Sequence, residues 1–262
     1  MEPRTARDLR TTPLPDVPCW VEPRLLLKGS ISMFAGPAAC GKTFMMLELA
    51  DHLSRGLQLY DHFFVPVPVR VLMIEQEVGQ YGMQERLCAK YSQPEDAPAD
   101  FFIYTKDPEV AVDDPGGFAR LLALVEKVAP GVLILDPVTR FMVGGGEEDN
   151  TAVARFVRQL DRLLMIRPDL SIIFTHHFRK DPQEPGDSWD DLDMRLARGG
   201  SKWGDIADLR VMLRCDQYEG GRPALWRTRW VPRHGPQFDL GLEMGNDFKI
   251  RAVQRSGGFG LS

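Results

Sequence analysis

The sequence lacks any run of about eighteen apolar residues, the length that a helix needs to cross a bilayer. Residues 1–18 are rich in proline and charge and have no apolar core segment, which excludes a secretory signal peptide. The four cysteines include no CxxC pair, which argues against a structural zinc site and a disulfide framework and fits a reducing compartment. We therefore expect a cytoplasmic protein with no membrane partner.

The chain also lacks a basic excess, because 37 acidic residues outnumber 32 lysines and arginines and the net charge is −5. Proteins that coat nucleic acid usually carry the opposite balance, so any nucleic-acid contact must be local, as in the lumen of a ring. No internal repeat and no low-complexity tract occurs. With 262 residues, the chain is long enough for one large α/β domain or two small ones.

Short apolar segments alternate with helical patterns up to residue 176, which predicts a parallel sheet with crossover helices. Each apolar segment is nearly continuous, as in strands that are covered on both faces. The expected strands are residues 30–35, 69–75, 101–105, 131–136 and 170–176, and the expected helices are residues 43–54, 80–91, 117–128 and 150–164.

The pattern changes after residue 200. The segments 210–216, 224–231 and 238–244 are typical of antiparallel strands separated by polar turns. The predicted fold class is therefore α/β, a mostly parallel central sheet flanked by helices, with a C-terminal antiparallel extension of the sheet. The expected domains are a flexible N-terminal arm over residues 1–22, one domain over residues 23–254 and a flexible tail over residues 255–262.

The segment GPAACGKT matches the phosphate-binding pattern G-x-x-x-x-G-K-[ST] in full, between an apolar strand pattern and a helical pattern. Glycines let backbone N–H groups turn toward phosphate oxygens, and the following helix directs its N-terminal dipole at the anion. The pattern assigns Lys42 to the β- and γ-phosphates and the Thr43 hydroxyl to Mg²⁺, so ATP with Mg²⁺ is the predicted ligand. The predicted nucleotide-binding residues are Gly36, Pro37, Ala38, Ala39, Cys40, Gly41, Lys42, Thr43 and Phe44.

Two strand ends offer the carboxylates that hydrolysis requires. Asp136 closes the segment GVLILD and fits the residue that holds Mg²⁺ through water at the end of a neighbouring strand. Glu75 and Glu77 end the segment VRVLMIEQE, and residues two apart in a strand share a face. We favour Glu77 as the base that orients the attacking water, with Glu75 as the alternative, because ligands bind beyond the carboxyl ends of such strands.

These motifs occur in the order found in RecA-like ATPases: phosphate loop, acidic strand end, ILDPVTRF, THHFRK and RGGSKWGDIADL. From about Leu25 to Val253 the chain most resembles the RepA-type hexameric replicative helicases and the AAA_25-like ATPases of plasmids and phages. The resemblance implies a RecA-like P-loop NTPase fold and a homo-oligomer, a hexameric ring with ATP between subunits. It also implies DNA helicase activity on single-stranded DNA, with any primase or loader a separate protein.

The resemblance carries catalytic roles over by position. Glu77 matches the catalytic glutamate of the family and Asp136 its magnesium-associated aspartate. His177 matches the histidine that senses the γ-phosphate, and its neighbour His176 is the second choice.

A ring ATPase also needs a cation from the neighbouring subunit, since an extra positive charge at the γ-phosphate stabilises the transition state. Arg198, in RGGS, is similar to the arginine of the RepA-type RGSS segment. Arg233, in RHGP, is similar to that of the DnaB-type RNGP turn, although Val231 replaces the lysine two positions earlier. Both arginines are candidates for this role.

The resemblance places DNA contacts in loops at the ring centre, here residues 139–151 and 179–198. The first loop has Arg140 followed by GGGEED, and the second mixes Arg179 and Lys180 with six acidic residues. An acidic loop binds phosphates poorly unless single basic residues face the DNA. A solvated loop without DNA contact is the alternative interpretation.

Two other functions stay open. One is a recombinase-like DNA-dependent ATPase that forms filaments, and the other is a regulatory ATP-dependent oligomeric switch whose partner is a protein. A GTPase is disfavoured because TKDP, at Thr105, lacks the asparagine of the NKxD motif. A small-molecule kinase is disfavoured because the region where an arginine-rich lid would lie is acidic.

Overall fold

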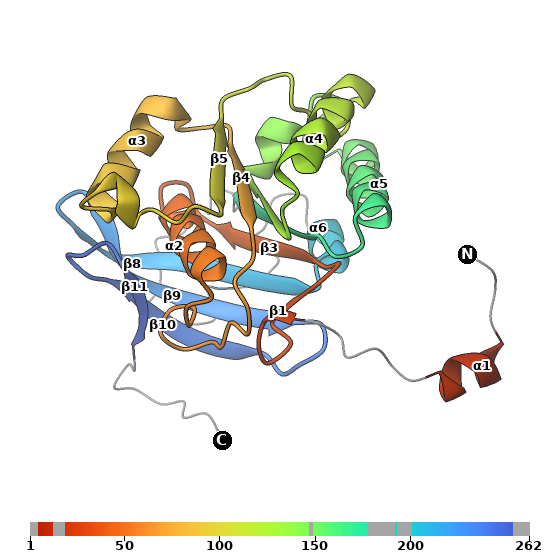
Figure 1. Ribbon diagram of the computed structural model, residues 1–262, viewed down its shortest axis with the longest axis horizontal. Helices are drawn as coiled ribbons and strands as arrows, with labels where there is room; N and C mark the ends of the chain where they lie inside the picture. The colour runs from red at the N-terminus through yellow and green to blue at the C-terminus, as the bar shows by residue number, and fades with distance from the viewer. Residues whose placement is uncertain (1–4, 13–18, 147–148, 178–191, 193–200, 254–262) are drawn as a thin grey trace.

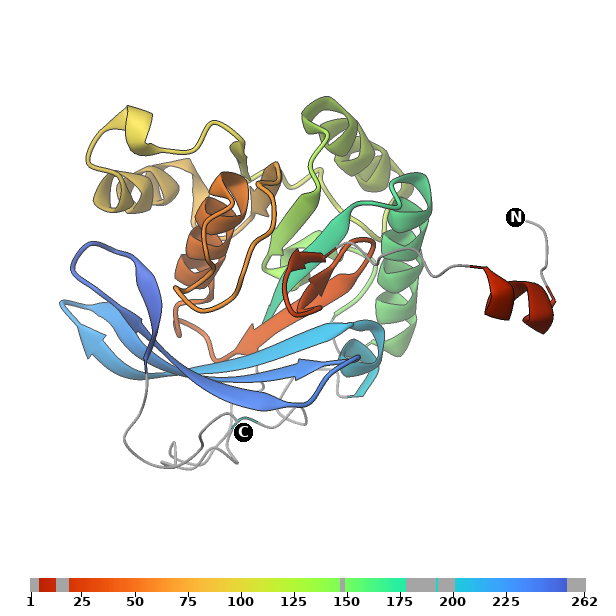
Figure 2. The same ribbon diagram turned by 60° about the horizontal axis from the view of Figure 1, so that its bottom comes forward.

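The computed structural model describes residues 5–12, 19–146, 149–177, 192 and 201–253. Nine strands form one sheet in the order β11-β10-β9-β8-β3-β7-β6-β4-β5 (Figures 1 and 2). These strands are β3 (Ile31–Gly36), β4 (Val71–Glu75), β5 (Phe101–Thr105), β6 (Val132–Asp136), β7 (Ser171–His177), β8 (Leu209–Glu219), β9 (Arg222–Pro232), β10 (Phe238–Met244) and β11 (Ile250–Val253).

The helices lie on both sides of the sheet (Figure 1). They are α2 (Lys42–Arg55), α3 (Gly79–Lys90), α4 (Pro115–Val128), α5 (Asn150–Ile166) and α6 (Ser201–Ile206), with 3₁₀ turns η1 (Pro94–Asp96) and η2 (Val138–Phe141). One apolar core joins α2 and α3 to one face of the sheet, and a second joins α4, α5 and Trp203 of α6 to the other.

The sheet has a parallel part and an antiparallel part, as the sequence predicts. Strands β5, β4, β6, β7, β3 and β8 are parallel, and β9, β10 and β11 then continue the same sheet in antiparallel order. The register pairs Glu75 with Asp136 and Gly36 with His177. The carboxyl ends of the parallel strands therefore meet at one edge, where ligands bind in open α/β sheets.

The helix ends follow from local sequence. Asp114 caps α4 by accepting a hydrogen bond from the Gly117 amide, and Pro115 occupies the first turn, where no amide donor is needed. Gly56 ends α2 in the left-handed region with φ 67°, a conformation that costs glycine little. The expected boundaries of the main helices and central strands agree with these elements to within two residues.

The amino-terminal region contains elements that the sequence pattern did not predict. A short helix α1 (Ala6–Thr11) has a capping box between Thr5 and Asp8 and stands clear of the sheet in Figure 1. Strand β1 (Cys19–Val21) pairs with β2 (Leu26–Leu27), and all three β1 residues are buried. The arm expected over residues 1–22 therefore includes a strand that packs on the core, and residues 255–262 lie outside the described part.

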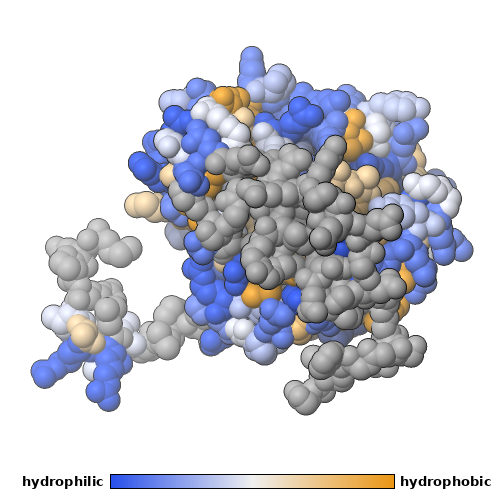
Figure 3. All heavy atoms as spheres, turned by 180° about the vertical axis from the view of Figure 1, so that it is seen from behind, coloured by the Kyte–Doolittle hydropathy of each residue, from blue (hydrophilic) through white to orange (hydrophobic). Residues whose placement is uncertain are grey.

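In the described part of the chain, no helix is both long and apolar enough to cross a membrane. On the face in Figure 3, the coloured residues are mostly hydrophilic and the apolar ones lie scattered among them.

Trp230 tests the antiparallel extension of the core. Its ring is 1% exposed, packs edge-on against Phe34 at a centroid distance of 5.8 Å and stacks on Phe238 at 5.9 Å. We expect Trp230→Ala to lower the free energy of unfolding by about 3–5 kcal/mol in urea titration, because it leaves a cavity. Met165→Ala, at an 82% exposed site on α5, is the control and should change it by less than about 0.5 kcal/mol. Equal effects of the two variants would contradict this packing.

Candidate functional site

The phosphate loop connects β3 to α2 at the carboxyl edge of the sheet. Gly41 has φ 90°, and a Cβ atom at this position would lie 2.9 Å from Pro223 and Trp226. The Trp226 indole donates a hydrogen bond to the Cys40 carbonyl at 2.5 Å, and the Tyr218 hydroxyl donates one to the Ala39 carbonyl at 3.4 Å. Strands β8 and β9 thus support the loop from behind, which explains why glycine is required at position 41.

Cys40 has a packing role in this loop. It is 2% exposed, and burial raises the pKa of its thiol, so the reactive thiolate is disfavoured.

Lys42 lies at the centre of the loop and is 6% exposed. Its ammonium group donates hydrogen bonds to the carbonyls of Gly36 at 3.0 Å and Pro37 at 2.7 Å, and its Nζ lies 3.2 Å from His177 Nδ1. A buried ammonium group needs such partners, because an unpaired charge in the interior is costly. The same cation is available to a phosphate oxygen that enters the loop.

Asp136 and Thr43 are brought together as the sequence predicts. The Thr43 hydroxyl donates a hydrogen bond to Asp136 Oδ2 at 2.7 Å, and the Thr175 hydroxyl donates one to Oδ1. Burial raises the pKa of the Asp136 carboxyl, against the hydrogen bonds from Thr175 and Thr43, which lower it. A hydroxyl and a carboxylate oxygen on adjacent elements are a donor set that suits Mg²⁺.

The two glutamates after β4 are not equivalent. Glu75 is 0% exposed, and its carboxylate accepts hydrogen bonds from the backbone amides of Glu77, Val78 and Gly79 at the start of α3. The strand ends at Glu75, so the expectation that both glutamates share one strand face is wrong. The cap turns the chain after Glu75 and leaves the Glu77 side chain exposed beyond the strand end.

The two histidines at the end of β7 point in different directions. His176 is buried, and its ring lies 5.2 Å from the Trp203 ring on the α6 side of the sheet. His177 instead approaches Lys42 in the phosphate loop. The alternation of side chains along a strand accounts for this difference and brings His177, rather than His176, to the loop.

The two candidate arginines differ in what the structure reveals of them. Arg198 lies outside the described residues, as do Arg179 and Lys180 of the second predicted DNA loop. Arg233 directly follows β9 and is 46% exposed, with its guanidinium paired to Asp208 at 3.0 Å. Because β9 is antiparallel to β8, Arg233 lies at the edge of the sheet opposite to the phosphate loop of its own chain.

The first predicted DNA loop, residues 139–151, is anchored to the domain. Asp113 accepts hydrogen bonds from the amides of Val143 and Gly144, both at 2.8 Å, and Arg155 donates to the Gly144 carbonyl at 2.6 Å. Arg140 is exposed at its start, while residues 147 and 148 lie outside the described part.

The structure adds Arg86 to the site, a residue that sequence reasoning missed. Its guanidinium lies over the Phe44 ring, 4.8 Å from the ring centre, directly after the phosphate loop. Its Nη1 atom is buried and has no hydrogen-bond partner within the described ranges. The amphipathic pattern of α3 places Arg86 on a helix, but no pattern predicts which loop this helix packs against.

A family model described as an AAA domain matches residues 2–183. The chain belongs to this AAA domain family. Two solved structures have the same fold. One, the ATPase domain of a helicase, has a TM-score of 0.62 and 13% identity, over 87% of this chain and 86% of that one. The other, a KaiC-like protein of the hyperthermophilic archaeon Pyrococcus horikoshii OT3, has a TM-score of 0.56 and 11% identity, over 90% and 94%.

These likenesses identify a RecA-like P-loop ATPase fold, as the sequence predicts. No curated protein sequence matches the chain.

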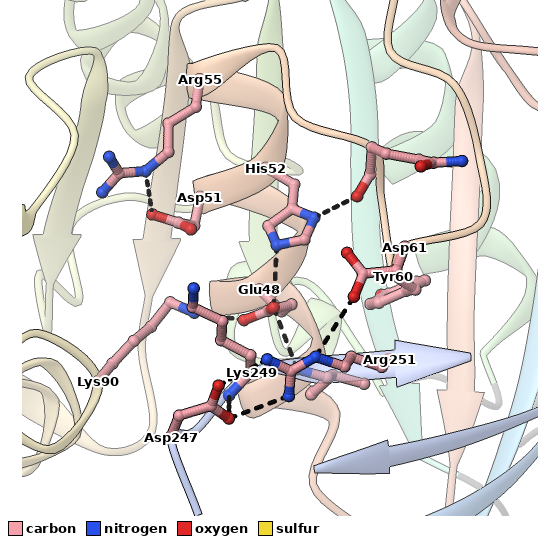
Figure 4. A network of polar contacts seen from close by, with 12 residues as sticks. Glu48, Asp51, His52, Arg55, Tyr60, Asp61, Lys90, Asp247, Lys249 and Arg251 are labelled. Carbon is pink, nitrogen blue, oxygen red and sulfur yellow. Dashed lines mark hydrogen bonds and ion pairs between the residues drawn. The ribbon is translucent and has the colours of Figure 1, made fainter. Parts of the chain in front are cut away.

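A buried ionic network fixes helix α2 of this AAA domain behind the phosphate loop (Figure 4). Glu48 is 1% exposed and lies between His52, at 3.0 Å, and the ammonium group of Lys90 at the end of α3. It also accepts a hydrogen bond from the Ile250 amide of β11 at 3.1 Å. The helix that starts in the loop is thereby joined to α3 and to the last strand.

This network predicts acid sensitivity. Burial alone would raise the pKa of Glu48, but the hydrogen bond from His52 and the charge of Lys90 outweigh it and hold the pKa below its ordinary value of 4.5. A carboxyl whose pKa is lowered on folding stabilises the protein above its unfolded pKa, and this contribution is lost as pH falls through the folded pKa. We expect the free energy of unfolding to decrease below about pH 4.5.

The matched variant is Glu48→Gln, which leaves Lys90 without its counter-charge. It should cost about 3 kcal/mol at neutral pH and reduce the acid dependence, as measured by urea titrations between about pH 3.5 and pH 7. Asp247→Asn removes a solvent-exposed ion pair with Arg251 and is the control. An unchanged acid profile in Glu48→Gln would contradict this role of the network.

Proposed function

We propose that this chain is an ATP-hydrolysing ring motor that acts on single-stranded DNA, a replicative DNA helicase. The observation that carries the proposal is the convergence of Lys42, Thr43, Asp136 and His177 at one sheet edge, with Arg233 on the opposite edge. A site of this kind binds the triphosphate on one side and takes a cation from the next subunit on the other.

The phosphates of ATP enter the loop from residue 36 to residue 43, where backbone N–H groups and the α2 amino end favour an anion. Lys42 then exchanges its contacts with the loop carbonyls for the β- and γ-phosphates. Thr43 and Asp136 would hold Mg²⁺, which neutralises charge on the phosphates when bound. Arg86 and Phe44 lie beyond the loop, where they can contact the nucleoside.

Glu77 orients the attacking water and accepts its proton, since Glu75 is committed to the cap of α3. His177 contacts Lys42 directly, so a change at the γ-phosphate is transmitted to β7 and to the segment after it. Arg233 or Arg198 of the adjacent subunit stabilises the charge that develops on the transferred phosphoryl group.

The two glutamates separate catalysis from structure. We expect Glu77→Gln to lower ATP turnover by about 10²- to 10⁴-fold while nucleotide affinity stays near wild type, because only the proton acceptor is lost. Glu75→Gln should instead lower the melting temperature, because Gln caps the α3 amides less well than a carboxylate. Steady-state turnover, nucleotide-binding titration and thermal unfolding of both variants test this. Full turnover in Glu77→Gln would exclude it as the base.

Single-stranded DNA distinguishes a helicase from a regulatory switch that binds a protein partner. A helicase predicts several-fold stimulation of turnover by single-stranded DNA at low salt, and weaker stimulation as salt rises, because phosphate contacts release counterions. Lys42→Ala is the control and should abolish turnover with or without DNA. Turnover without stimulation and without DNA binding would favour the switch, an alternative supported by the acidic loop that follows Arg140.

A further inference from the structure

Arg233 cannot serve the phosphate loop of its own chain. The loop is contacted by Trp226 near the start of β9, whereas Arg233 follows Pro232 at the end of that strand. Six residues separate Trp226 from Pro232, which corresponds to about 20 Å along a strand. An arginine side chain does not span this distance, so a triphosphate that Arg233 contacts must be bound to a second copy of the chain.

Asp208 holds Arg233 in place through both its backbone and its side chain. The Arg233 amide donates a hydrogen bond to the Asp208 carbonyl at 2.7 Å, and the guanidinium Nη1 lies 3.0 Å from Asp208 Oδ1. The Nη2 atom donates to the Asp205 carbonyl at 2.6 Å. These contacts orient the guanidinium at the end of the β8–β9 hairpin.

The other oxygen of the same carboxylate contacts the strand that leads to the phosphate loop. Asp208 Oδ2 accepts a hydrogen bond from the Ile31 amide at 3.1 Å, and the Asp208 amide donates one to the Ile31 carbonyl at 2.7 Å. Ile31 is the first residue of β3, and Gly36, the last, opens the loop. One aspartate therefore joins the start of β3 to the arginine.

We propose that Asp208 is a positioning residue for Arg233 acting on the neighbouring subunit, and that it links this arginine to the β3 strand of its own site. This inference rests on the proposed function. A guanidinium has five N–H donors, and Arg233 is 46% exposed, so donors stay available for a phosphate after the contacts with Asp208 and Asp205. Holding the cation in advance of the reaction is what makes such a group effective in the transition state.

The first test is Asp208→Asn. Asn retains a carbonyl oxygen for the Ile31 amide but loses the charge that pairs with Arg233. We expect kcat to fall about tenfold with little change in KM, because the arginine acts mainly in the transition state. Asp247→Asn removes an aspartate–arginine ion pair of similar exposure at the β10–β11 turn and should leave kcat unchanged.

Mixed oligomers separate a positioning role from a structural one. Lys42→Ala subunits have a defective loop but an intact Asp208 and Arg233, whereas Asp208→Asn subunits have an intact loop. In a 1:1 mixture, about a quarter of the interfaces combine an intact loop with an intact arginine. Turnover per subunit should rise toward a quarter of wild type, while dilution alone would halve the activity of Asp208→Asn. Energy transfer between labelled subunits verifies that the copies have mixed.

A mixture of Arg233→Ala with Lys42→Ala is the reference for complementation. If this mixture recovers activity and the Asp208→Asn mixture does not, Asp208 acts only within its own subunit and the inference is wrong. If neither recovers, Arg233 does not act in trans and the inference is also wrong. A wild-type protein that is monomeric or hydrolyses no ATP refutes the proposed function itself, so the two failures are distinguishable.

Discussion

The buried carboxylate of Asp136 is the constraint on which the arrangement of this structure depends. The residue is 2% exposed, and a carboxylate in such a place is stable only with hydrogen-bond donors around it. Its two donors are hydroxyls from separate elements, Thr43 on α2 and Thr175 on β7. Strands β6 and β7 and the start of α2 must therefore be in register, since a slip of one residue would turn each side chain to the other face.

The same requirement explains why the phosphate loop is rigid before any ligand binds. Helix α2 is fixed at its first turn by the bond from Thr43 to Asp136 and further along by the ion pair of Glu48 with Lys90. Strands β8 and β9 support the loop between these points through Trp226. Entry of a triphosphate then requires only that Lys42 exchanges partners, and a preorganised site of this kind loses little free energy to reorganisation.

The sequence was sufficient for the features that depend on local chemistry. Continuous apolar segments predicted the buried strands, and GPAACGKT together with the strand end at Asp136 predicted two groups that the structure brings into contact. Features that depend on packing between distant segments were not predicted. The cap at Glu75 requires α3 to begin directly after β4, and the contact of Arg86 with Phe44 joins residues 42 positions apart (86 − 44). Neither has a periodicity that sequence alone reveals.

The separation of Lys42 and Arg233 on opposite edges of one sheet has a consequence for assembly. Two groups that cannot meet within a chain can meet only through a heterologous interface, in which each subunit presents one edge to its neighbour and receives the other. Such an interface closes into a ring or continues as a filament, depending on the rotation between copies. In both cases β3 and the β8–β9 hairpin connect the two edges within each subunit. Because Asp208 joins these elements at one edge and Trp226 at the other, a displacement at one phosphate loop is passed through the sheet to the arginine that serves the next.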